Sequence, residues 1–206
     1  MFWLESDFSE LWDLCRGSAE LGYVSRRRCG GMLRSPTVFE DIIKTICTTN
    51  CDWRNTKRMC ESLCALHDGA FPDATTLVRI PAAKLRSQTS MGYRVRTVKT
   101  VARQWVNGKL PIDEWARAGD YLRIRESLGR IWGIGDYSIN HILVLLGDFS
   151  QIPVDSEVLQ YLRQAHFGGA QVDGKAAVLP FQRFGKYQYI AYKFGRIARR
   201  LNYVDK

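Results

Sequence analysis

The sequence Ile131-Trp132-Gly133-Ile134-Gly135 is followed, twenty residues after its last glycine, by Asp155 in the segment Pro153-Val154-Asp155. Apolar residues at helical spacing lie on both sides of the glycines, which predicts a tight turn between two helices over residues 122–146. Such a turn presents backbone N–H groups at the start of its second helix, where the helix dipole favours a phosphate. Asp155 is predicted to begin a later helix. A phosphate-binding turn with a carboxylate at a fixed spacing indicates chemistry beside a nucleic-acid backbone.

Neither element is diagnostic when it is taken alone. A Gly-x-Gly sequence between packed helices is most often an ordinary turn, and aspartate is a common helix N-cap. The two elements together, in this order and at this spacing, favour a functional interpretation.

The composition predicts a globular chain with an anionic partner. The 206 residues are 46% hydrophobic and 25% charged, which is enough for one domain or two closely packed lobes. The net charge of +9 favours a nucleic acid as partner, although a merely basic surface is the alternative.

No apolar run reaches the length of about eighteen residues that a membrane span needs, and the amino terminus lacks the pattern of a signal peptide. The protein is therefore expected to have no membrane association and to be intracellular. That means cytoplasmic or nucleoid-associated in a bacterium or archaeon, and nuclear in a eukaryote.

The cysteines raise the question of a metal site. An intracellular chain keeps thiols reduced, and the spacings Cys47-x3-Cys51 and Cys60-x3-Cys64 would allow zinc. Most of these cysteines fall within apolar helical patterns, so small buried thiols are the favoured interpretation. The six cysteines are Cys15, Cys29, Cys47, Cys51, Cys60 and Cys64.

The chain as a whole is predicted to be all-α, because one helical pattern follows another without a strand-rich region. Ser35-Pro36 is a helix start signal, and Asp52 is suited to cap the next helix. The polar stretch from Gly168 to Pro180 is predicted to be a loop, and residues 185–201 are predicted to form the last helix.

Several short motifs, in this order, resemble those of the helix-hairpin-helix (HhH-GPD) DNA glycosylase superfamily, and they are closest to the 8-oxoguanine and 3-methyladenine glycosylase branches. The resemblance covers most of the chain. The matching segments are Ser35-Pro36 to Asn50 (a long helix and its following loop), Thr48-Thr49-Asn50 (Ser-Ser-Asn in the family), Met91-Gly92-Tyr93-Arg94 (Leu-Gly-Tyr-Arg), Ile131 to Gly135 (the hairpin) and Pro153-Val154-Asp155 (the catalytic aspartate segment).

The resemblance implies a two-lobed helical fold with the helix-hairpin-helix motif at residues 122–146. One lobe would contain residues 35–140, and the other would combine residues 1–34 with residues 141–206. The sequence begins near the first helix of these enzymes, so it does not include their amino-terminal β domain. No cysteine follows Cys64, so the iron–sulfur cluster of other branches is not expected either.

The resemblance also implies an activity, namely hydrolysis of the N-glycosidic bond of a damaged or mispaired base in duplex DNA, as in base excision repair. Asp155 would stabilise positive charge on the sugar or orient the attacking water. Gly133 and Gly135 would bind the DNA backbone. No cofactor is expected for the chemistry, although the backbone carbonyls of Gly129, Ile131 and Ile134 would hold a monovalent cation in the hairpin. The expected partner is lesion-containing double-stranded DNA, bound by a monomer.

Other matching positions would contact the distorted duplex. Asn50 would fill the gap that the flipped nucleotide leaves, Tyr93 would wedge beside the opposite base, and Arg94 would contact that unpaired base. A turn residue and a packed surface aromatic are the plain alternatives for Asn50 and Tyr93.

A lesion pocket is expected to have aromatic walls, because a flipped base stacks on aromatic rings. Tyr137 and His141 are the leading candidates, since helical spacing places them on one face. Ordinary core aromatics are the alternative for most of the set. The full set is Trp53, Trp132, Tyr137, His141, Tyr189 and Tyr192.

One departure from the family pattern bears on the mechanism. Bifunctional members carry a lysine two residues after the second hairpin glycine, and here that position is Tyr137. A phenol cannot form a Schiff base, so a monofunctional hydrolase is predicted. The alternatives are a glycosylase/lyase that uses another amine, such as Lys99 or Lys186, and a non-catalytic protein that binds DNA structure through the hairpin.

Overall fold

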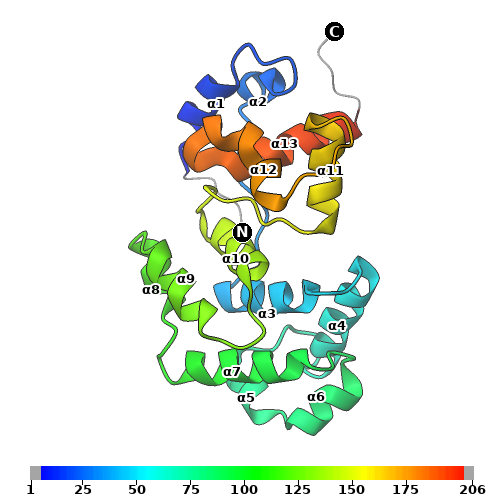
Figure 1. Cartoon of the computed structure of the whole chain (residues 1–206). Coiled ribbons are helices and arrows are strands. Elements are labelled where there is room, and N and C mark those ends of the chain that lie inside the picture. The colour runs from blue at the N-terminus through cyan, green and yellow to red at the C-terminus, as the bar shows by residue number, and fades with distance from the viewer. Residues whose placement is uncertain (1–5, 202–206) are drawn as a thin grey trace. The chain divides into compact units, whose positions relative to one another are not determined.

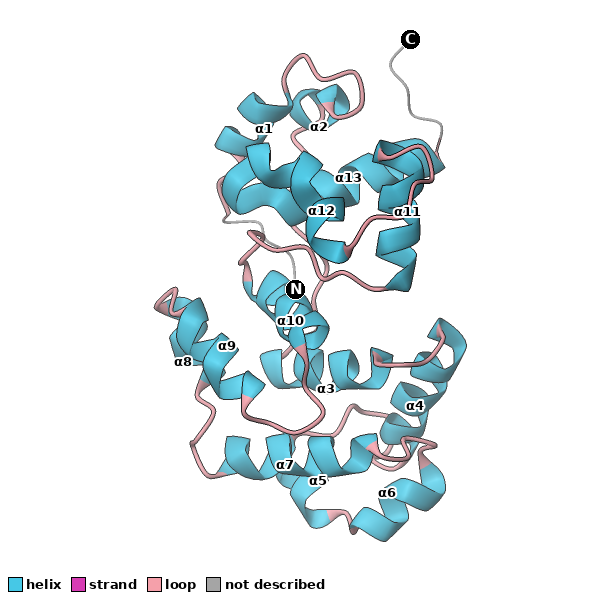
Figure 2. Cartoon of the chain, in the orientation of Figure 1, coloured by secondary structure: helices cyan, strands magenta, loops and turns pink. Residues whose placement is uncertain are grey.

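The computed structural model describes residues 6–201, and it is all-helical over that range, with no strand (Figures 1 and 2). The predicted fold class is therefore confirmed. Within the part of the chain that is described, no helix is both long and apolar enough to cross a membrane.

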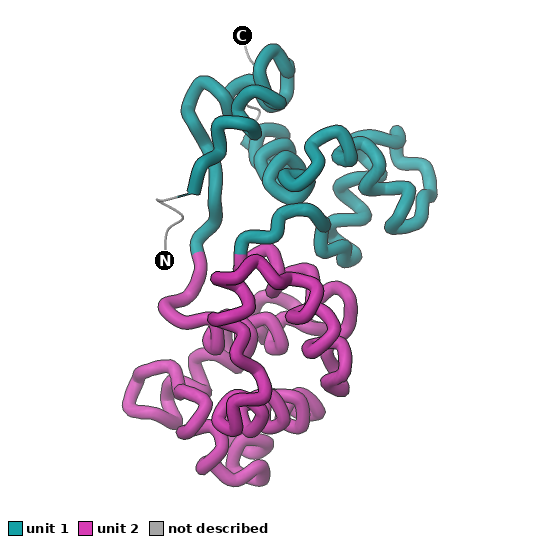
Figure 3. Tube along the Cα trace, turned by 90° about the vertical axis from the view of Figure 1, so that its left-hand side faces the viewer, with its two compact units in different colours: residues 1–33, 147–206 teal, residues 34–146 magenta. Residues whose placement is uncertain are grey.

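The chain divides into two compact units (Figure 3). Unit 1 consists of Met1–Leu33 and Gly147–Lys206, and unit 2 of Arg34–Leu146. The boundary expected after residue 140 falls inside a helix, α10 (Asp136–Leu146). The division lies after that helix instead, because α10 is continuous and packs on two helices of unit 2, α3 and α9.

Unit 2 is built around α7, which packs against α5, α6 and α3, while α10 packs against α3 and α9. Its core is aliphatic and includes the fully buried Ile42, Ile46, Val98 and Leu128. The helices of unit 2 are α3 (Val38–Thr48), α4 (Trp53–Ala65), α5 (Ala74–Arg79), α6 (Ala82–Gln88), α7 (Arg94–Val106), α8 (Ile112–Arg117), α9 (Tyr121–Gly129) and α10 (Asp136–Leu146).

Several of these helices begin at a side chain that accepts a backbone N–H bond of the first turn, as helix capping requires. Asp52 accepts from Asn55 N at 2.7 Å, which confirms its predicted role. Thr37 accepts from Glu40 N at 3.2 Å. The helix expected near Ser35-Pro36 therefore begins at Val38, where Thr37 supplies the cap.

Unit 1 has an aromatic core, in which Phe8 lies near Phe149 and Tyr187, and Phe181 lies near Phe184. Its helices are α1 (Ser9–Cys15), α2 (Gly22–Arg26), α11 (Ser156–His166), α12 (Gly174–Val178), the 3-10 helix η1 (Leu179–Tyr187) and α13 (Gln188–Arg200).

Two local predictions for unit 1 are wrong. The stretch 168–180 is not a continuous loop, because Asp173 accepts from Ala176 N at 2.7 Å and starts α12. The last helix does not begin at residue 185, because Gly185 has a φ of +50° and a ψ of −120°, which interrupts helical geometry. The α-helix α13 starts only at Gln188.

Candidate functional site

The glycine turn of unit 2 is exposed and is held in place from α7. Gly133 has a φ of +85°, which favours glycine. A Cβ atom on Gly133 would lie 2.4 Å from Thr97 Oγ1, whereas a Cβ on Gly135 would meet nothing within 4 Å. Thr97 Oγ1 also donates to the carbonyl oxygen of Trp132 at 3.0 Å. Gly133 is thus required by the turn itself, while Gly135 borders open space.

The start of α10 is suited to bind an anion. Gly135 precedes the helix and has no side chain with which to cap it, so the N–H groups of the first turn can serve an external acceptor. The exposed Asp136 opens the helix. Its charge suits the helix dipole but opposes a bound phosphate.

The backbone of this turn also has oxygen atoms that fit a monovalent cation. Gly129 ends α9, and Ile131 and Ile134 lie in the turn that follows. The Ile131 carbonyl accepts from Ile134 N at 3.1 Å, and a carbonyl oxygen keeps a second lone pair for another partner. Carbonyl oxygens are the hard ligands that such a cation takes, so the donor chemistry suits the expected cation, and its binding stays a prediction.

Unit 2 brings Asn50 and Tyr93 together, although they are far apart in the sequence. Asn50 lies between α3 and α4 with a φ of +47°. Its Nδ2 donates to Tyr93 Oη at 3.1 Å. Tyr93 is exposed over 49% of its surface. Both side chains lie on the outside of unit 2, where a large partner can reach them.

Arg94 differs from the expectation that it contacts an unpaired base. The side chain is only 7% exposed. Its guanidinium donates to the Thr49 carbonyl oxygen, to Thr49 Oγ1 at 3.3 Å and to the Met91 carbonyl oxygen at 3.5 Å. These acceptors turn the side chain inward, so Arg94 braces the loop that carries Asn50.

Trp132 lies on the surface of unit 2, and its place in a pocket wall stays a prediction. Its side chain is 52% exposed, and its ring centroid lies 6.4 Å from that of Tyr93 at an interplanar angle of 88°. The Arg96 guanidinium lies over the Trp132 ring, with Cζ 4.6 Å from the centroid. Trp53, at the first position of α4, is exposed over 69% of its surface.

Tyr137 and His141 stack on each other along α10, with ring centroids 6.0 Å apart and an interplanar angle of 14°. The prediction that the two side chains share one helix face is confirmed. Their contribution to a lesion pocket stays a prediction.

In unit 1, Asp155 is the N-cap of α11, as predicted. Its Oδ1 accepts from Val158 N at 2.7 Å. This bond fixes one carboxylate oxygen against the first turn of the helix and leaves the other oxygen for a different contact.

Tyr189 and Tyr192, which were expected in the pocket wall, lie with their ring centroids 5.9 Å apart on α13. Tyr192 is buried in the core of unit 1, against Phe181, and its hydroxyl accepts from Arg196 at 3.1 Å. Burial raises the pKa of Tyr192, and the nearby Asp155 and Glu157 carboxylates raise it further. Tyr192 is therefore a core residue in this structure, because its ring packs among other aromatics.

The two lysines considered as alternative nucleophiles have other partners. Lys99 is buried, and its Nζ donates to the carbonyl oxygens of Leu77, Val78 and Ile80 at 2.8, 2.8 and 2.7 Å. These bonds occupy all the protons of the ammonium group, although burial lowers the pKa of Lys99. The exposed Lys186 pairs with Glu10 at 2.5 Å, and that hydrogen bond raises its pKa.

Between residues 6 and 201, no cluster of three or more His, Cys, Asp or Glu side chains could hold a metal ion. Cys47 is buried, and its hydrogen bond with Cys60, together with burial, raises the pKa of the Cys47 thiol well above its usual value. Cys15 and Cys47 are buried, whereas Cys29, Cys51, Cys60 and Cys64 are partly exposed.

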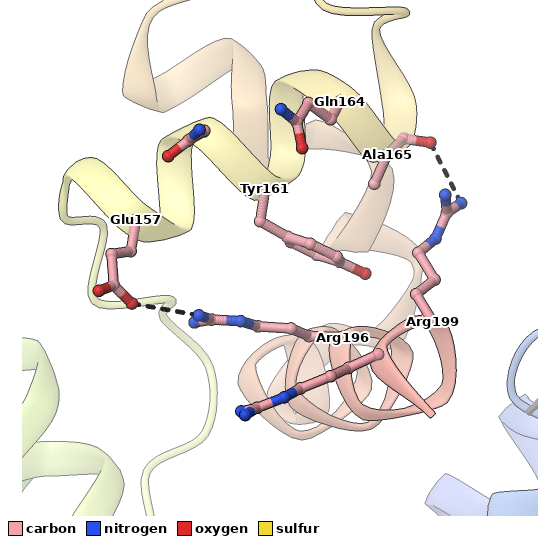
Figure 4. A pocket seen from close by; sticks show the side chains of 8 residues that line it. Glu157, Tyr161, Gln164, Ala165, Arg196 and Arg199 are labelled. Atoms are coloured by element: carbon pink, nitrogen blue, oxygen red, sulfur yellow. Dashed lines mark hydrogen bonds and ion pairs between the residues drawn. The ribbon is translucent and has the colours of Figure 1, made fainter. Parts of the chain in front are cut away.

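Unit 1 contains a cavity of about 520 Å³ between α11 and α13 that the sequence analysis missed (Figure 4). Three arginines line it, of which Arg196 pairs with Glu157 at 3.2 Å and Arg199 with Glu20 at 2.7 Å, and Arg200 is the third. Burial raises the pKa of Tyr161 in this cavity to about 12. The arginines recur at helical spacing near the end of the chain, but the sequence does not show which carboxylates face them.

The fold is shared with solved DNA glycosylases, although no model of a protein family and no curated sequence matches the chain. The 8-oxoguanine glycosylase/lyase of Clostridium acetobutylicum, in complex with DNA containing cytosine opposite 8-oxoguanine, is 21% identical with a TM-score of 0.76. The match covers 98% of this chain and 73% of that one.

Two 3-methyladenine glycosylases have the same fold over almost their whole length. The enzyme of Schizosaccharomyces pombe, in complex with abasic DNA, is 14% identical with a TM-score of 0.69, and the match covers 94% of this chain and 97% of that one. The enzyme of Bacillus halodurans is 18% identical with a TM-score of 0.72, and the match covers 96% of this chain and 92% of that one. The chain therefore has the helical fold of HhH-GPD glycosylases, as the sequence motifs predicted.

Proposed function

We propose that the protein is a DNA glycosylase that hydrolyses the N-glycosidic bond of a damaged or mispaired base in duplex DNA and leaves an abasic site. The observation that carries this proposal is the surface of unit 2, where Asn50 and Tyr93 are hydrogen-bonded to each other and Trp132 leads into the exposed glycine turn. Solved proteins of this fold act on DNA and have been crystallised with it. The net charge of +9 supports the same partner.

In this proposal the glycine turn holds a phosphate of the strand that carries the target. The N–H groups at the start of α10 contact the phosphate, and the contact carries no sequence information. Asn50 and Tyr93 enter the duplex beside the extruded nucleotide, which offsets part of the cost of unstacking it. A monovalent cation at the carbonyls of Gly129, Ile131 and Ile134 would keep the turn in this conformation, and it would take no part in bond cleavage.

Asp155 is the proposed catalytic carboxylate. As the base leaves, positive charge develops on the sugar, and a fixed anion stabilises that charge or orients the attacking water. The bond from Val158 N to Asp155 Oδ1 holds the carboxylate in one orientation. A preoriented group needs no reorganisation at the moment of reaction.

Water is the proposed nucleophile, so the enzyme would be monofunctional. Tyr137 occupies the position where a lysine would form a Schiff base. Lys99 already donates to the carbonyl oxygens of Leu77, Val78 and Ile80. We expect the protein to act as a monomer inside the cell, with Tyr137 and His141 against the extruded base.

An excision assay tests this proposal. The substrates are duplexes that contain 8-oxoguanine, an alkylated adenine, hypoxanthine, uracil or a thymine mismatch, and an undamaged duplex is the control. We expect the wild-type protein to release at least one base and Asp155→Asn to release none while still binding DNA. Binding without release by the wild type would contradict the proposal and would identify a DNA-structure-binding protein instead.

Treatment with borohydride during the reaction tests the nucleophile. A Schiff base becomes a covalent protein–DNA bond under these conditions, whereas hydrolysis by water leaves no adduct. We expect no adduct. A trapped complex that disappears in one lysine variant would assign a lyase activity to that lysine.

A further inference from the structure

We propose that Trp132 and Tyr93 together form a two-ring edge that enters the DNA, in which Trp132 stacks on the base next to the extruded nucleotide. This proposal rests on the proposed function and makes Trp132 a positioning residue, outside the lesion pocket. The proposed ligand of the two rings is a pair of neighbouring bases that have been separated from each other. These bases belong to the DNA strand whose phosphate lies at the glycine turn.

The first argument is exposure. Tyr93 and Trp132 are 49% and 52% exposed. One exposed ring on a protein surface needs no explanation, but here two large rings meet edge to face with their centroids 6.4 Å apart. Both belong to unit 2, so their arrangement is internal to one compact body. Paired exposed aromatic rings are a common means of stacking on nucleic-acid bases.

The second argument is that hydrogen bonds hold the Tyr93 hydroxyl and the Trp132 backbone before any ligand arrives. Tyr93 Oη accepts from Asn50 Nδ2 at 3.1 Å, and the backbone of Trp132 is held by Thr97 through a 3.0 Å bond. A ring that is already oriented loses little conformational freedom when it inserts. The rings are therefore organised for contact with a base.

The third argument is charge. Arg94 Cζ lies 4.7 Å from the Tyr93 ring centroid, and Arg96 Cζ lies 4.6 Å from the Trp132 ring centroid. Cation–π attraction holds each ring from one side, and the guanidinium of Arg96 supplies positive charge close to the edge. DNA has negative phosphates on both sides of its bases, so this arrangement matches a base step rather than an apolar protein surface.

The fourth argument is the position of Trp132 in the chain. It directly precedes Gly133, the first residue of the proposed phosphate-binding turn. A strand held at that turn therefore places the neighbouring base within reach of the Trp132 ring. Tyr93, hydrogen-bonded to Asn50, then wedges beside the opposite base while Asn50 fills the gap.

Unit 2 provides a matched control. Trp115 on α8 is also a tryptophan with an arginine over its ring, since Arg123 Cζ lies 4.6 Å from the centroid. It shares the ring chemistry and the cation contact of Trp132, but it lies neither at the glycine turn nor beside Tyr93. Replacement of Trp115 separates general loss of an aromatic side chain from loss of the two-ring edge.

The experiment uses a duplex with a tetrahydrofuran abasic analogue and 2-aminopurine as the adjoining base, which fluoresces more strongly when it is unstacked from its neighbours. With the wild type we expect the fluorescence to change on binding. With Trp132→Ala we expect that change to be lost and the affinity for the abasic duplex to fall about tenfold, the cost of one lost stacking contact. Affinity for an undamaged duplex should change by less than about twofold, because backbone contacts carry it.

Trp115→Ala should behave as the wild type in every measurement, and a Trp132→Ala variant that does the same would overturn the proposal. A second measurement covers the case in which Trp132→Ala does not fold. Trp132→Phe should abolish most of the DNA-induced quenching of tryptophan fluorescence, whereas Trp115→Phe should retain it, and equal quenching in the two variants would also overturn the proposal.

The outcome is distinguishable from failure of the proposed function. If the wild type excises a base and Asp155→Asn does not, the function holds, and an unaffected Trp132→Ala then removes only the two-ring edge. If the wild type excises nothing, the function fails whatever Trp132 does.

Discussion

Helices α10 and α11 begin in opposite ways. Gly135 precedes α10 and has no side chain with which to cap it, whereas Asp155 caps α11 through a 2.7 Å bond from Val158 N. At α10 the N–H groups of the first turn can bind an external anion. At α11 the protein supplies the anion itself, and the helix start holds that carboxylate in place.

The difference shows how one local element serves two tasks. A glycine before a helix lowers stability, because a side-chain cap contributes about 1 kcal/mol, and it leaves the first N–H groups open to an external anion. An aspartate cap accepts a hydrogen bond from the first turn of the helix and fixes the orientation of its own carboxylate. In this protein the two kinds of helix start lie in different units, α10 in unit 2 and α11 in unit 1.

The largest expected effect is at Asp155, the N-cap of α11. Asp155→Asn and Asp155→Ala should both reduce excision about a thousandfold or more, because an electrostatic stabiliser of the transition state is removed. Asparagine still caps a helix, so thermal unfolding of Asp155→Asn should match the wild type, while Asp155→Ala should lose about 1 kcal/mol. Denaturant unfolding and single-turnover excision measure the two effects. Full activity in Asp155→Asn would show that Asp155 is a cap and nothing more.

The second effect concerns the carboxyl end of α5, where the buried ammonium group of Lys99 binds backbone carbonyl oxygens. Lys99 Nζ binds the carbonyl oxygens of Leu77 and Val78 at the end of α5 and that of Ile80 just after it. Lys99→Met should cost about 2–4 kcal/mol in the free energy of unfolding, because buried carbonyls lose their donor.

Urea unfolding measures this loss, and Lys84→Met on the exposed face of α6 is the control that should change little. A Lys99→Met variant as stable as the wild type would show that the carbonyls find other donors.

The third effect concerns the two glycines that precede α10. Gly133→Ala should lose about 1–3 kcal/mol in stability, because its φ of +85° is unfavourable for alanine and Cβ would approach Thr97. A Cβ on Gly135 meets no protein atom within 4 Å. Gly135→Ala should therefore fold normally and yet bind DNA about tenfold more weakly, because the methyl group occupies space that a phosphate needs.

Fluorescence anisotropy on an undamaged duplex, at two salt concentrations, measures the affinity. If Gly135→Ala binds DNA as tightly as the wild type does, no DNA strand approaches the start of α10.

The smallest effect is at the far end of α11. His166, the last residue of that helix, packs against Phe181, and burial lowers its pKa below the ordinary value of 6.5. The unfolded chain then binds a proton more readily than the folded one, so stability is lost as the pH falls through about 6.5. His166→Phe should reduce this loss, as measured by thermal unfolding at pH 5 and pH 7.5. An identical pH dependence in the variant would assign the effect to other groups.

Local sequence signals predicted a large part of this structure. The caps at Asp52 and Asp155 depend on a residue and the next helical turn, and the shared helix face of Tyr137 and His141 depends only on helical spacing. Such features are encoded within a few neighbouring residues, so they can be read without the fold.

The orientation of Arg94 and the surroundings of Trp132 could not be predicted in this way. Arg94 is held by Thr49, which lies 45 residues away, and Trp132 is held by Thr97, 35 residues away. Which acceptor captures a long side chain depends on tertiary packing, and the motif around Arg94 gives its position but not its direction. The ion pairs at the cavity between α11 and α13 likewise join distant positions, because Arg196 pairs with Glu157 of α11 and Arg199 with Glu20.

Thr97 of α7 holds the glycine turn through its hydrogen bond to the Trp132 carbonyl oxygen. Thr97 lies one turn into α7, so the glycine turn and Tyr93 are both attached to the start of the same helix. If DNA binds as proposed, the Tyr93 ring would therefore enter the base stack at a constant offset from the phosphate at the glycine turn.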